Sequence, residues 1–319
     1  MRILITGAAG FIGSHLSEKL LELGHQVIGI DNFDPFYARN TKEDNLKIAL
    51  KNPLFSFHEL DITSTSDFEK WPDKIDIVVH LAAKAGVRPS IENPEVYLKT
   101  NILGTLNVLE YMRKIDCYNL VFASSSSVYG NNKKIPFEES DPADHPISPY
   151  AASKKSCELL LYNYHKLYQF NCINLRFFTV FGPRQRPDLA IHKFVKKISD
   201  NQPIEVYGQG DTARDYTYVD DTISGIVEAI NRVHSNQTVF ETINLGNNAP
   251  VSLNALIQKI ETLLGLKAQI KHLPLQDGDV DITYSSIDKA KKLLNYNPVT
   301  PIDEGLIKFV AWYKSQNFK

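Results

Sequence analysis

The chain has 319 residues, of which 43% are hydrophobic, and its formal net charge is -2 at pH 7. This length and apolar content suffice for one large α/β unit with a smaller domain, and the near-neutral charge argues against nucleic acid as the main partner. No apolar run approaches the roughly 20 residues of a membrane helix, and the first residues lead directly into a strand with no signal peptide. We therefore expect a cytoplasmic protein without membrane attachment.

Three cysteines are present, Cys117, Cys157 and Cys172. Their spacing matches neither a metal site nor a secreted disulfide framework. We expect reduced thiols and no bound metal ion.

A glycine-rich turn follows the first predicted strand, Arg2–Thr6. Its glycines have the spacing Gly-x2-Gly-x2-Gly, and a helical pattern follows. One glycine permits the tight bend, one lets a pyrophosphate approach the backbone, and one lets the helix pack closely on the sheet. The phosphates then meet the N–H groups at the start of the helix. The residues expected to hold this part of a dinucleotide are Gly7, Gly10, Phe11, Ile12 and Gly13.

A second apolar strand, Gln26–Ile30, is followed by Asp31 and Asn32. This order of strand, glycine turn, helix, strand and acidic residue is typical of a dinucleotide-binding unit. The Asp31 carboxylate can accept hydrogen bonds from the adenosine ribose diol, and its charge would repel a 2′-phosphate, so NAD is favoured over NADP. The alternative is a flavodoxin-like turn in which the glycines serve packing only.

Two further strands are predicted to end at the same edge of the sheet. The first, residues 54–60, leads into Asp61 and Ile62. The Asp61 carboxylate could bond the adenine amino group, or it could cap a helix start, since hydroxyl residues follow. The second, Ile75–Leu81, is of the buried parallel type and leads into a segment of small side chains across which a cofactor could lie flat. The candidates there are Leu81, Ala82, Ala83 and Lys84.

A helix predicted at Pro94–Tyr111 carries Asn101, and the next strand, Leu120–Ala123, ends in four serines. In a doubly wound sheet, ligands bind in the crevice beyond the carboxyl ends of the strands. The hydroxyls of Ser125 and Ser127 could therefore bond a substrate oxygen, although four serines could also form only a flexible turn.

Tyr150 and Lys154 are four residues apart and are separated only by small residues. On a helix this spacing puts both side chains on one face. A phenol ionises near pH 10, and a nearby ammonium group favours the phenolate and lowers its pKa. The pair is a candidate general base for a sugar or alcohol hydroxyl, although the same spacing occurs by chance on many helices.

Further along, the pattern predicts a strand at Asn171–Gly182, a helix at Asp220–Val233, and a strand at Thr242–Leu245 that rejoins the main sheet.

Several motifs, in this order, resemble the extended short-chain dehydrogenase/reductase family over essentially the whole chain. They are Gly7-x2-Gly10-x2-Gly13, His80-Leu81-Ala82-Ala83, Ser125-Ser126-Ser127-Val128-Tyr129-Gly130, Tyr150-x3-Lys154, Gly182-Pro183-Arg184-Gln185-Arg186 and Arg214-Asp215-Tyr216-Thr217-Tyr218. Within that family the chain most resembles nucleotide-sugar 4-epimerases, and among these the UDP-glucuronate 4-epimerases. The resemblance implies an NAD cofactor, a UDP-sugar substrate and a role in polysaccharide biosynthesis.

The resemblance also implies a fold of the α/β class. It is a Rossmann-type doubly wound parallel sheet with a smaller C-terminal α/β substrate-binding domain. We expect residues 1–182 and about 214–246 to form the NAD-binding Rossmann domain. The nucleotide-sugar-binding domain is expected at about 183–213 and 247–319.

The implied reaction inverts C4 of a UDP-hexuronic acid, UDP-glucuronate to UDP-galacturonate, through a 4-keto intermediate. Tyr150 would be the acid/base, and Lys154 would bond the nicotinamide ribose and lower the tyrosine pKa. Ser125, with Ser127 near it, would bond the sugar O4. Two alternatives are open: a 4-epimerase of UDP-glucose or UDP-N-acetylglucosamine, and a non-catalytic NAD-binding regulator on the same fold.

The set Ser125, Ser126 and Ser127 helps to decide the reaction. Related 4,6-dehydratases carry Thr-Asp-Glu at these places, because water elimination needs an acid and a base, and decarboxylases that form UDP-xylose place a glutamate here. This chain offers only hydroxyls, which suit hydride and O4 proton movement.

The last third of the chain carries the residues expected to recognise the substrate. Thr179 stands where galactose-type epimerases have asparagine, and its smaller side chain would leave room for a group on C6. An arginine fork matches a carboxylate bidentately, so Arg186 is the candidate for the C6 carboxylate, unless the cations here bind the UDP phosphates or face water. Tyr207, in a predicted strand and turn, could flank the uracil. The substrate contacts implied are Arg88, Ser126, Thr179, Arg186, Lys193, Tyr207 and Arg214, and Asn101 and Phe178 would line the cofactor.

The chain departs from the pattern of UDP-glucuronate 4-epimerases in two places. Lys84 stands where glutamine is usual, and Asp277 where proline is usual. Many galactose-type enzymes also have an arginine where this chain has Gln276 and Asp277, which leaves the diphosphate contact of this loop open.

A homodimer is expected, because family members pair through the helix that begins at Tyr150. That helix carries apolar residues which could instead fill the core of one subunit. They are Leu159, Leu160, Leu161 and Leu167.

Overall fold

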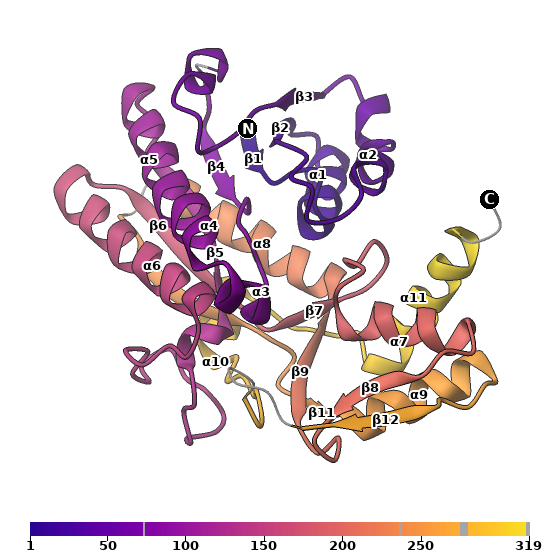
Figure 1. Ribbon diagram of the computed structural model, residues 1–319. Coiled ribbons are helices and arrows are strands. Elements are labelled where there is room, and N and C mark those ends of the chain that lie inside the picture. Colours follow the sequence, from indigo (N-terminus) through magenta and orange to yellow (C-terminus); the bar gives the residue numbers. More distant parts are fainter. Residues whose placement is uncertain (73, 236–237, 275–279, 317–319) are drawn as a thin grey trace.

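The computed structural model is built around one parallel sheet, and it describes residues 1–72, 74–235, 238–274 and 280–316 (Figure 1). The strands run in the order β10-β6-β5-β4-β1-β2-β3, and every neighbouring pair is parallel. Their bounds are β1 (Arg2–Thr6), β2 (Gln26–Asp31), β3 (Phe55–Glu59), β4 (Ile77–His80), β5 (Asn119–Ser125), β6 (Asn171–Phe177) and β10 (Phe240–Leu245). The predicted Rossmann-type sheet is confirmed, and the strand expected at Thr242–Leu245 does rejoin it as part of β10.

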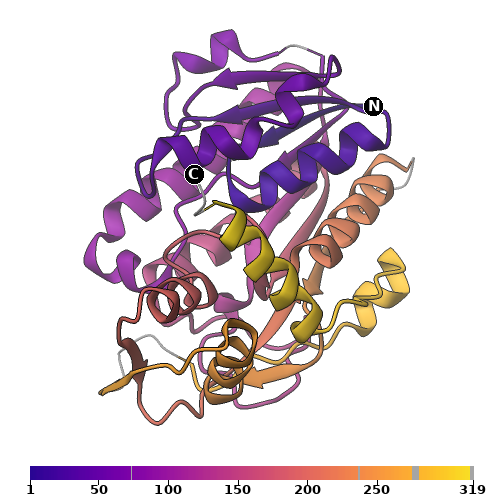
Figure 2. The same ribbon diagram turned by 90° about the vertical axis from the view of Figure 1, so that its right-hand side faces the viewer.

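Helices cover both faces of this sheet (Figures 1 and 2). They are α1 (Phe11–Glu22), α2 (Arg39–Leu46), α5 (Gly104–Lys114), α6 (Pro149–Tyr168) and α8 (Val219–His234). Successive strand residues point to opposite faces. In β1, Leu4 lies in the core with residues of α5 and α6, whereas Ile3 and Ile5 lie in the core with residues of α1 and α8. Strands that are apolar on both faces are what a covered parallel sheet requires.

The helix predicted at Pro94–Tyr111 is interrupted. α3 (Val87–Glu92) and α4 (Pro94–Tyr97) come first, and a π-helical turn at Leu98–Leu103 connects α4 to α5. Such turns occur frequently at functional sites. This one carries Asn101, which is buried and bonds the segment after β4.

The strand predicted at Asn171–Gly182 is wrong in one respect, because it is two strands in two sheets. β6 ends at Phe177, Phe178 N donates to Leu245 O at 3.1 Å, and β7 (Thr179–Phe181) then pairs with β9. A single residue thus carries the chain from the main sheet into the smaller part of the molecule.

Among the described residues, the smaller part contains two short sheets and three helices. The sheets have the orders β11-β9-β7 and β12-β8. The remaining strands and helices are α7 (Ala190–Ser199), β8 (Ile204–Tyr207), β9 (Ala213–Tyr218), β11 (Pro250–Ser252), α9 (Leu253–Leu264), β12 (Ile270–Leu273), α10 (Asp288–Leu294) and α11 (Ile302–Gln316). Of these, α10 packs against α8 and β10 of the main sheet unit. Short 3-10 turns lie in the main unit, at Ala49–Lys51, Asp67–Lys70 and Ser126–Tyr129. Both α7 and α11 pack against α9.

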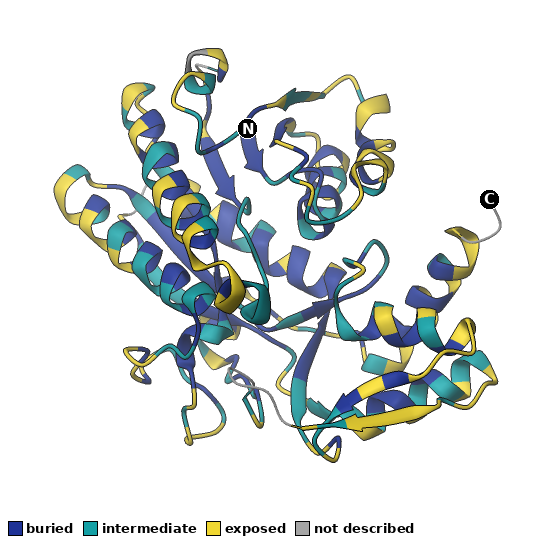
Figure 3. Ribbon diagram, in the orientation of Figure 1, coloured by how far each residue is buried: buried dark blue, intermediate teal, exposed yellow. Residues whose placement is uncertain are grey.

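Burial follows this layered arrangement: the central strands are buried, the edge strand β3 is only partly buried, and the outer faces of the helices are exposed (Figure 3). The leucines of α6 divide accordingly: Leu161 is fully buried, Leu160 packs against the core, and Leu159 and Leu167 are each 61% exposed. Within the described ranges, no helix combines the length and apolar character needed to cross a membrane.

Candidate active site

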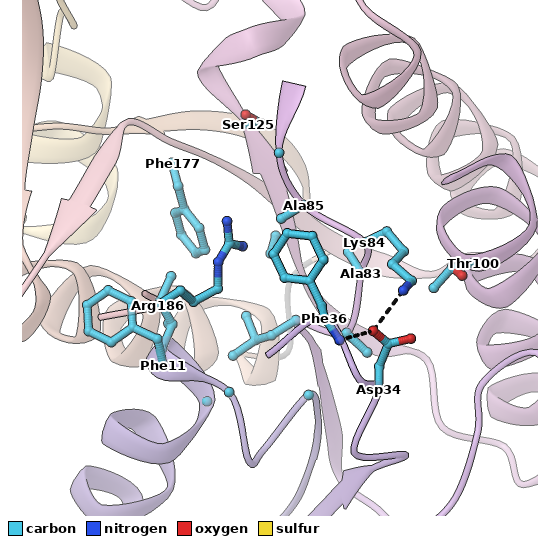
Figure 4. A pocket seen from close by; sticks show the side chains of 18 of the residues that line it. Phe11, Asp34, Phe36, Ala83, Lys84, Ala85, Thr100, Ser125, Phe177 and Arg186 are labelled. Atoms are coloured by element: carbon cyan, nitrogen blue, oxygen red, sulfur yellow. Dashed lines mark hydrogen bonds and ion pairs between the residues drawn. The ribbon is translucent and has the colours of Figure 1, made fainter. Parts of the chain in front are cut away.

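A cavity of about 490 Å³ lies at the carboxyl edge of the main sheet, where α/β folds bind their ligands (Figure 4). Of the residues predicted to hold a cofactor, its lining includes Gly7, Gly10, Phe11, Ile12, Gly13, Asp31, Asn32, Ile62, Leu81, Ala82, Ala83, Lys84, Tyr150, Lys154 and Phe178. The other predicted residues in the lining are Ser125, Ser126, Ser127, Thr179 and Arg186. Within the described residues, the predicted contacts outside this lining are Asp61, Arg88, Asn101, Lys193, Tyr207 and Arg214.

The glycine turn after β1 forms a backbone surface of the cavity. Gly7 has a φ of +75°, and a Cβ on Gly13 would lie 2.2 Å from the Gly7 carbonyl oxygen, so side chains are excluded at both positions. α1 begins at Phe11 with Gly10 as its N-cap, and its first turn has no acidic residue. A helix start of this kind favours an anion. The turn therefore fits the pyrophosphate of a dinucleotide.

Asp31 is buried at the end of β2. Its carboxylate accepts hydrogen bonds from Ala9 N at 3.2 Å and Phe33 N at 2.9 Å, and Lys42 Nζ donates to it at 3.3 Å. The three donors fix the carboxylate, and its oxygens keep capacity to accept from a ribose diol. Lys42 is a cavity residue that the sequence did not reveal, because it lies in a polar segment with no distinctive spacing.

Asp61 does not cap a helix, since Ser66 precedes the next helical turn, Asp67–Lys70, and Asp61 instead holds a turn. It accepts Thr63 N at 2.7 Å, and it accepts Asn32 Nδ2 at 2.9 Å. The carboxylate thereby holds Asn32 against the cavity, and a contact from Asp61 to adenine stays a prediction.

The segment after β4 is fixed by Asn101. Lys84 N donates to Asn101 Oδ1 at 2.8 Å, and Asn101 Nδ2 donates to Lys84 O at 3.0 Å and to Ser153 Oγ at 2.9 Å. Asn101 thus joins the wall of the cavity to α6 from behind. The Lys84 side chain reaches across to Asp34, with Nζ 2.7 Å from Oδ1 (Figure 4).

Tyr150 and Lys154 both line the cavity from the first turns of α6, as their spacing predicts. Tyr150 N donates to Ser90 Oγ at 3.1 Å, and its ring packs edge-on against Tyr97 with the centroids 6.2 Å apart. Lys154 Nζ donates to Ala123 O at 2.7 Å. Ser90 and Tyr97 position the tyrosine, and nothing in their sequence context indicated this.

The pKa of Tyr150 shifts in the opposite direction to the one expected. Burial raises the pKa of Tyr150, and its hydrogen bond with Ser125 and the charge of Arg186 only partly offset this. The Lys154 ammonium points at the Ala123 carbonyl, and burial lowers the pKa of Lys154 to about 8, against the opposing effect of Cys157 and Glu158. Burial therefore outweighs the attraction that the helix spacing suggested.

The four serines lead from the strand into an ordered 3-10 turn: Ser124 and Ser125 end β5, and Ser126 and Ser127 begin the turn. Ser125 Oγ donates to Ser127 Oγ at 3.1 Å and accepts from Ser127 N at 3.2 Å, so its hydroxyl is oriented on both sides. Ser124 Oγ donates to Glu158 Oε1 at 2.6 Å. The turn is therefore fixed, and Ser125 and Ser127 present hydroxyls to the cavity beside Tyr150.

A buried ion pair lies behind this turn. Arg176 donates to Glu158 through Nε at 2.9 Å and Nη2 at 2.8 Å, and its guanidinium lies 4.7 Å from the Tyr129 ring centre. Tyr129 Oη in turn donates to Asn244 Oδ1 at 2.7 Å. The network connects α6, β6 and β10, and it supports the serine turn and Lys154 from within the core.

The region after β7 supplies Arg186 to the cavity. Its guanidinium lies 5.3 Å from the Phe36 ring centre and forms a two-bond pair with Asp188. Arg184 faces elsewhere, because its Nη1 lies 2.8 Å from Glu18 of α1.

A second cavity of about 170 Å³ adjoins the first. It shares Ser126, Ser127 and Thr179 with the first cavity, and Arg214 also lines it.

Arg88 lies over the Tyr207 ring, 4.1 Å from its centre, so these two predicted contacts are brought together. Lys193 is exposed on α7, and its contact with substrate stays a prediction. Gln276 and Asp277 lie outside the described residues.

In the part of the chain that the structure describes, no group of three or more His, Cys, Asp or Glu residues is placed to hold a metal ion. The three cysteines are free and buried.

The NAD dependent epimerase/dehydratase family has a sequence model that matches residues 3–246. The chain belongs to this family, and the resemblance drawn from the motifs is confirmed. A UDP-glucuronate 4-epimerase of Thermodesulfobacterium geofontis is 44% identical to it over 316 residues, covering 98% of this chain and 95% of that protein.

Two solved structures share the whole fold. A UDP-glucuronic acid 4-epimerase from Bacillus cereus, in complex with UDP-glucuronic acid and NAD, matches with a TM-score of 0.93 and 37% identity over 99% of this chain and 100% of its own. A UDP-glucose 4-epimerase from Thermotoga maritima, with UDP-glucose, matches with a TM-score of 0.90 and 31% identity over 99% and 100%.

Proposed function

We propose that the chain is an NAD-dependent epimerase that inverts C4 of a UDP-hexuronic acid and interconverts UDP-glucuronate and UDP-galacturonate. The observation that carries the proposal is the combination, on one cavity, of Tyr150 beside an ordered set of serine hydroxyls with Arg186 and the small Thr179. The similarity to the UDP-glucuronate 4-epimerases of T. geofontis and B. cereus supports it.

NAD is the proposed cofactor, and it would supply a reversible hydride acceptor for C4 of the sugar. The glycine turn would hold its pyrophosphate, Asp31 and Lys42 its adenosine ribose, and Lys154 its nicotinamide ribose. The excluded Cβ positions at Gly7 and Gly13 support this assignment, since they leave bare backbone at the start of α1.

Tyr150 is proposed to take the proton from the sugar O4 and to return it after the sugar has turned. Ser125 is oriented by Ser127 and would hold O4 at the tyrosine oxygen. Because burial raises the pKa of Tyr150, the phenolate must be favoured by positive charge, and Lys154 and Arg186 are the cations of the chain that line the same cavity near it.

Arg186 is proposed to hold the C6 carboxylate of the substrate. A 4-keto uronate is a β-keto acid and tends to lose CO2, so the carboxylate must be kept in an orientation that is poor for cleavage. The pair with Asp188 uses Nε and Nη2 of Arg186. A substrate carboxylate would therefore exchange with Asp188 or bond through Nη1, with Thr179 as a further hydroxyl donor.

The proposal is tested by incubating the purified protein with UDP-glucuronate and following the products by NMR without added NAD. UDP-galacturonate at equilibrium would support both the reaction and a tightly held cofactor. No conversion, even with NAD, would contradict the proposal. UDP-pentose with CO2 would mean that the site decarboxylates.

The similarity to the T. maritima enzyme favours UDP-glucose as a second candidate substrate. Conversion of UDP-glucose with no conversion of UDP-glucuronate would select it.

We also propose a division into two domains, a homodimer and a cytoplasmic location. The division into an NAD-binding part, residues 1–182 and about 214–246, is supported by the membership of α8 and β10 in the main sheet unit. A homodimer through α6 is supported by the exposure of Leu159 and Leu167, and analytical ultracentrifugation of Leu159→Glu would test it. A cytoplasmic location is supported by the three free, buried thiols.

A further inference from the structure

We propose that the ion pair between Lys84 and Asp34 is a latch that closes over the bound dinucleotide and slows its release. The inference rests on the NAD-dependent function proposed above. Lys84 Nζ lies 2.7 Å from Asp34 Oδ1, and both residues belong to the lining of the larger cavity (Figure 4). An epimerase that returns its hydride in every cycle benefits from keeping its cofactor between turnovers.

The position of the pair in the sheet gives it this role. Lys84 follows β4 and Asp34 follows β2, and these strands are the two neighbours of β1. A bridge between the two loops therefore passes across the carboxyl end of β1, where the turn Gly7–Gly13 forms the expected phosphate site. A dinucleotide seated on that turn would lie within the ring that the bridge completes.

Other hydrogen bonds hold the backbone at both residues of the latch. Asn101 bonds the backbone N–H and carbonyl of Lys84, at 2.8 and 3.0 Å. Asp34 N donates to Asn32 Oδ1 at 3.0 Å, and Phe36 N donates to the Asp34 carboxylate at 3.0 Å. The backbone at both ends is therefore fixed, and the pair costs mainly the rotamer freedom of the Lys84 side chain.

The same loop is also anchored on the substrate side. Phe36 follows Asp34 closely, and its ring centre lies 5.3 Å from the guanidinium of Arg186. Loop 32–37 thus extends from Lys84, on the cofactor side, to the residue proposed to hold the sugar carboxylate. Opening the latch would remove the attachment of this loop to the segment after β4, while the bond from Asn32 to Asp61 and the contact of Phe36 with Arg186 remain.

The latch can open, because it borders solvent. The Lys84 and Asp34 side chains are 20% and 27% exposed. Ion pairs of this kind contribute modestly and weaken with salt. We expect the latch to slow cofactor release by about threefold to fivefold, the range that such pairs support.

The test is the rate at which bound NAD leaves. Protein loaded with NAD is mixed with excess NADH, and the rise in bound NADH fluorescence reports release. Lys84→Gln, which installs the residue usual at this position, and Asp34→Asn should each speed release about threefold to fivefold, and the double variant should add nothing further. Added salt should speed release from the wild type and leave the variants unchanged. Lys259→Gln is the control, since Lys259 forms an ion pair of the same 2.7 Å length with Asp303, away from the cavity.

Unchanged release in either single variant, or effects that add in the double variant, would overturn the latch. In the additive case Lys84 would act on the dinucleotide directly. A wild-type protein that binds neither NAD nor NADH would overturn the proposed function as well, so the two failures are distinguishable.

Discussion

Arg186 directs its Nε and Nη2 at the two carboxylate oxygens of Asp188, at 2.9 and 2.8 Å. The side chains are 19% and 34% exposed, so the pair lies at the edge of the cavity and is not sealed in the core. A carboxylate of the chain thus occupies the fork that a substrate carboxylate would need. Asp188 thus stands where we propose that the carboxylate of the uronic acid binds.

This overlap predicts a gain of affinity when Asp188 is neutralised. Asp188→Asn should lower the KM for UDP-glucuronate about threefold, because the substrate no longer competes with a charged partner of modest strength. The KM for UDP-glucose, which has no carboxylate, should not change. Steady-state kinetics on both substrates measure this, and a higher KM for UDP-glucuronate would show that Asp188 instead holds Arg186 in place.

Removal of Arg186 should act on the uronate selectively. Arg186→Ala is expected to lower kcat/KM for UDP-glucuronate about tenfold to hundredfold, the cost of losing hydrogen bonds to a charged group. Binding of UDP-glucose should change far less.

Arg184→Ala is the matched control for Arg186, because Arg184 pairs with Glu18 of α1 and does not belong to the cavity lining. It should leave both substrates unaffected. If Arg186→Ala lowers kcat/KM equally for both substrates, the assignment of Arg186 to the substrate carboxylate is contradicted.

The pKa values of Tyr150 and Lys154 predict the pH dependence of the rate. Burial raises the pKa of Tyr150 above its ordinary value and lowers that of Lys154 to about 8. The active form, with Tyr150 as tyrosinate and Lys154 charged, has one proton fewer than the fully protonated pair. The two residues titrate together, so this first proton leaves the pair near pH 8, the lower of their two pKa values. The rate should therefore rise as the pH increases through about 8.

Lys154→Met checks this assignment. Without the lysine the first proton must come from Tyr150, so the rising limb of the pH–rate profile should move to higher pH. A limb that stays near pH 8 in Lys154→Met would show that another group sets it.

The buried pair of Glu158 and Arg176 predicts a stability effect. Glu158→Gln leaves the Arg176 guanidinium buried without its counter-charge, which should lower the free energy of unfolding by about 3–5 kcal/mol. Glu22→Gln, which removes an exposed partner of Lys19, should cost at most about 1 kcal/mol. Chemical denaturation of both variants makes the comparison, and similar small losses would contradict a structural role for the buried pair.

Much of the site could be predicted from the sequence because its residues are close together in the chain. The glycine turn, the serines and the Tyr150–Lys154 spacing each lie within a few residues, and all of them line one cavity. The parallel sheet followed from strands that are apolar on both faces.

The remaining features depend on distances between segments that are far apart in the sequence. The pairs Lys84–Asp34 and Arg176–Glu158 connect different elements, and no local pattern indicates either partner. The raised pKa of Tyr150 follows from burial, which spacing on a helix does not reveal. The break at Phe178 is also tertiary in origin, because β7 leaves the main sheet to pair with β9.

In the proposed reaction, C4 is inverted by a hydride that leaves and returns within the site. The most direct measurement uses UDP-glucuronate with deuterium at C4, incubated with the protein in ordinary water without added NAD. We expect UDP-galacturonate that retains deuterium at C4, and no product with Tyr150→Phe. Product that has lost the deuterium, or UDP-pentose released with CO2, would contradict it.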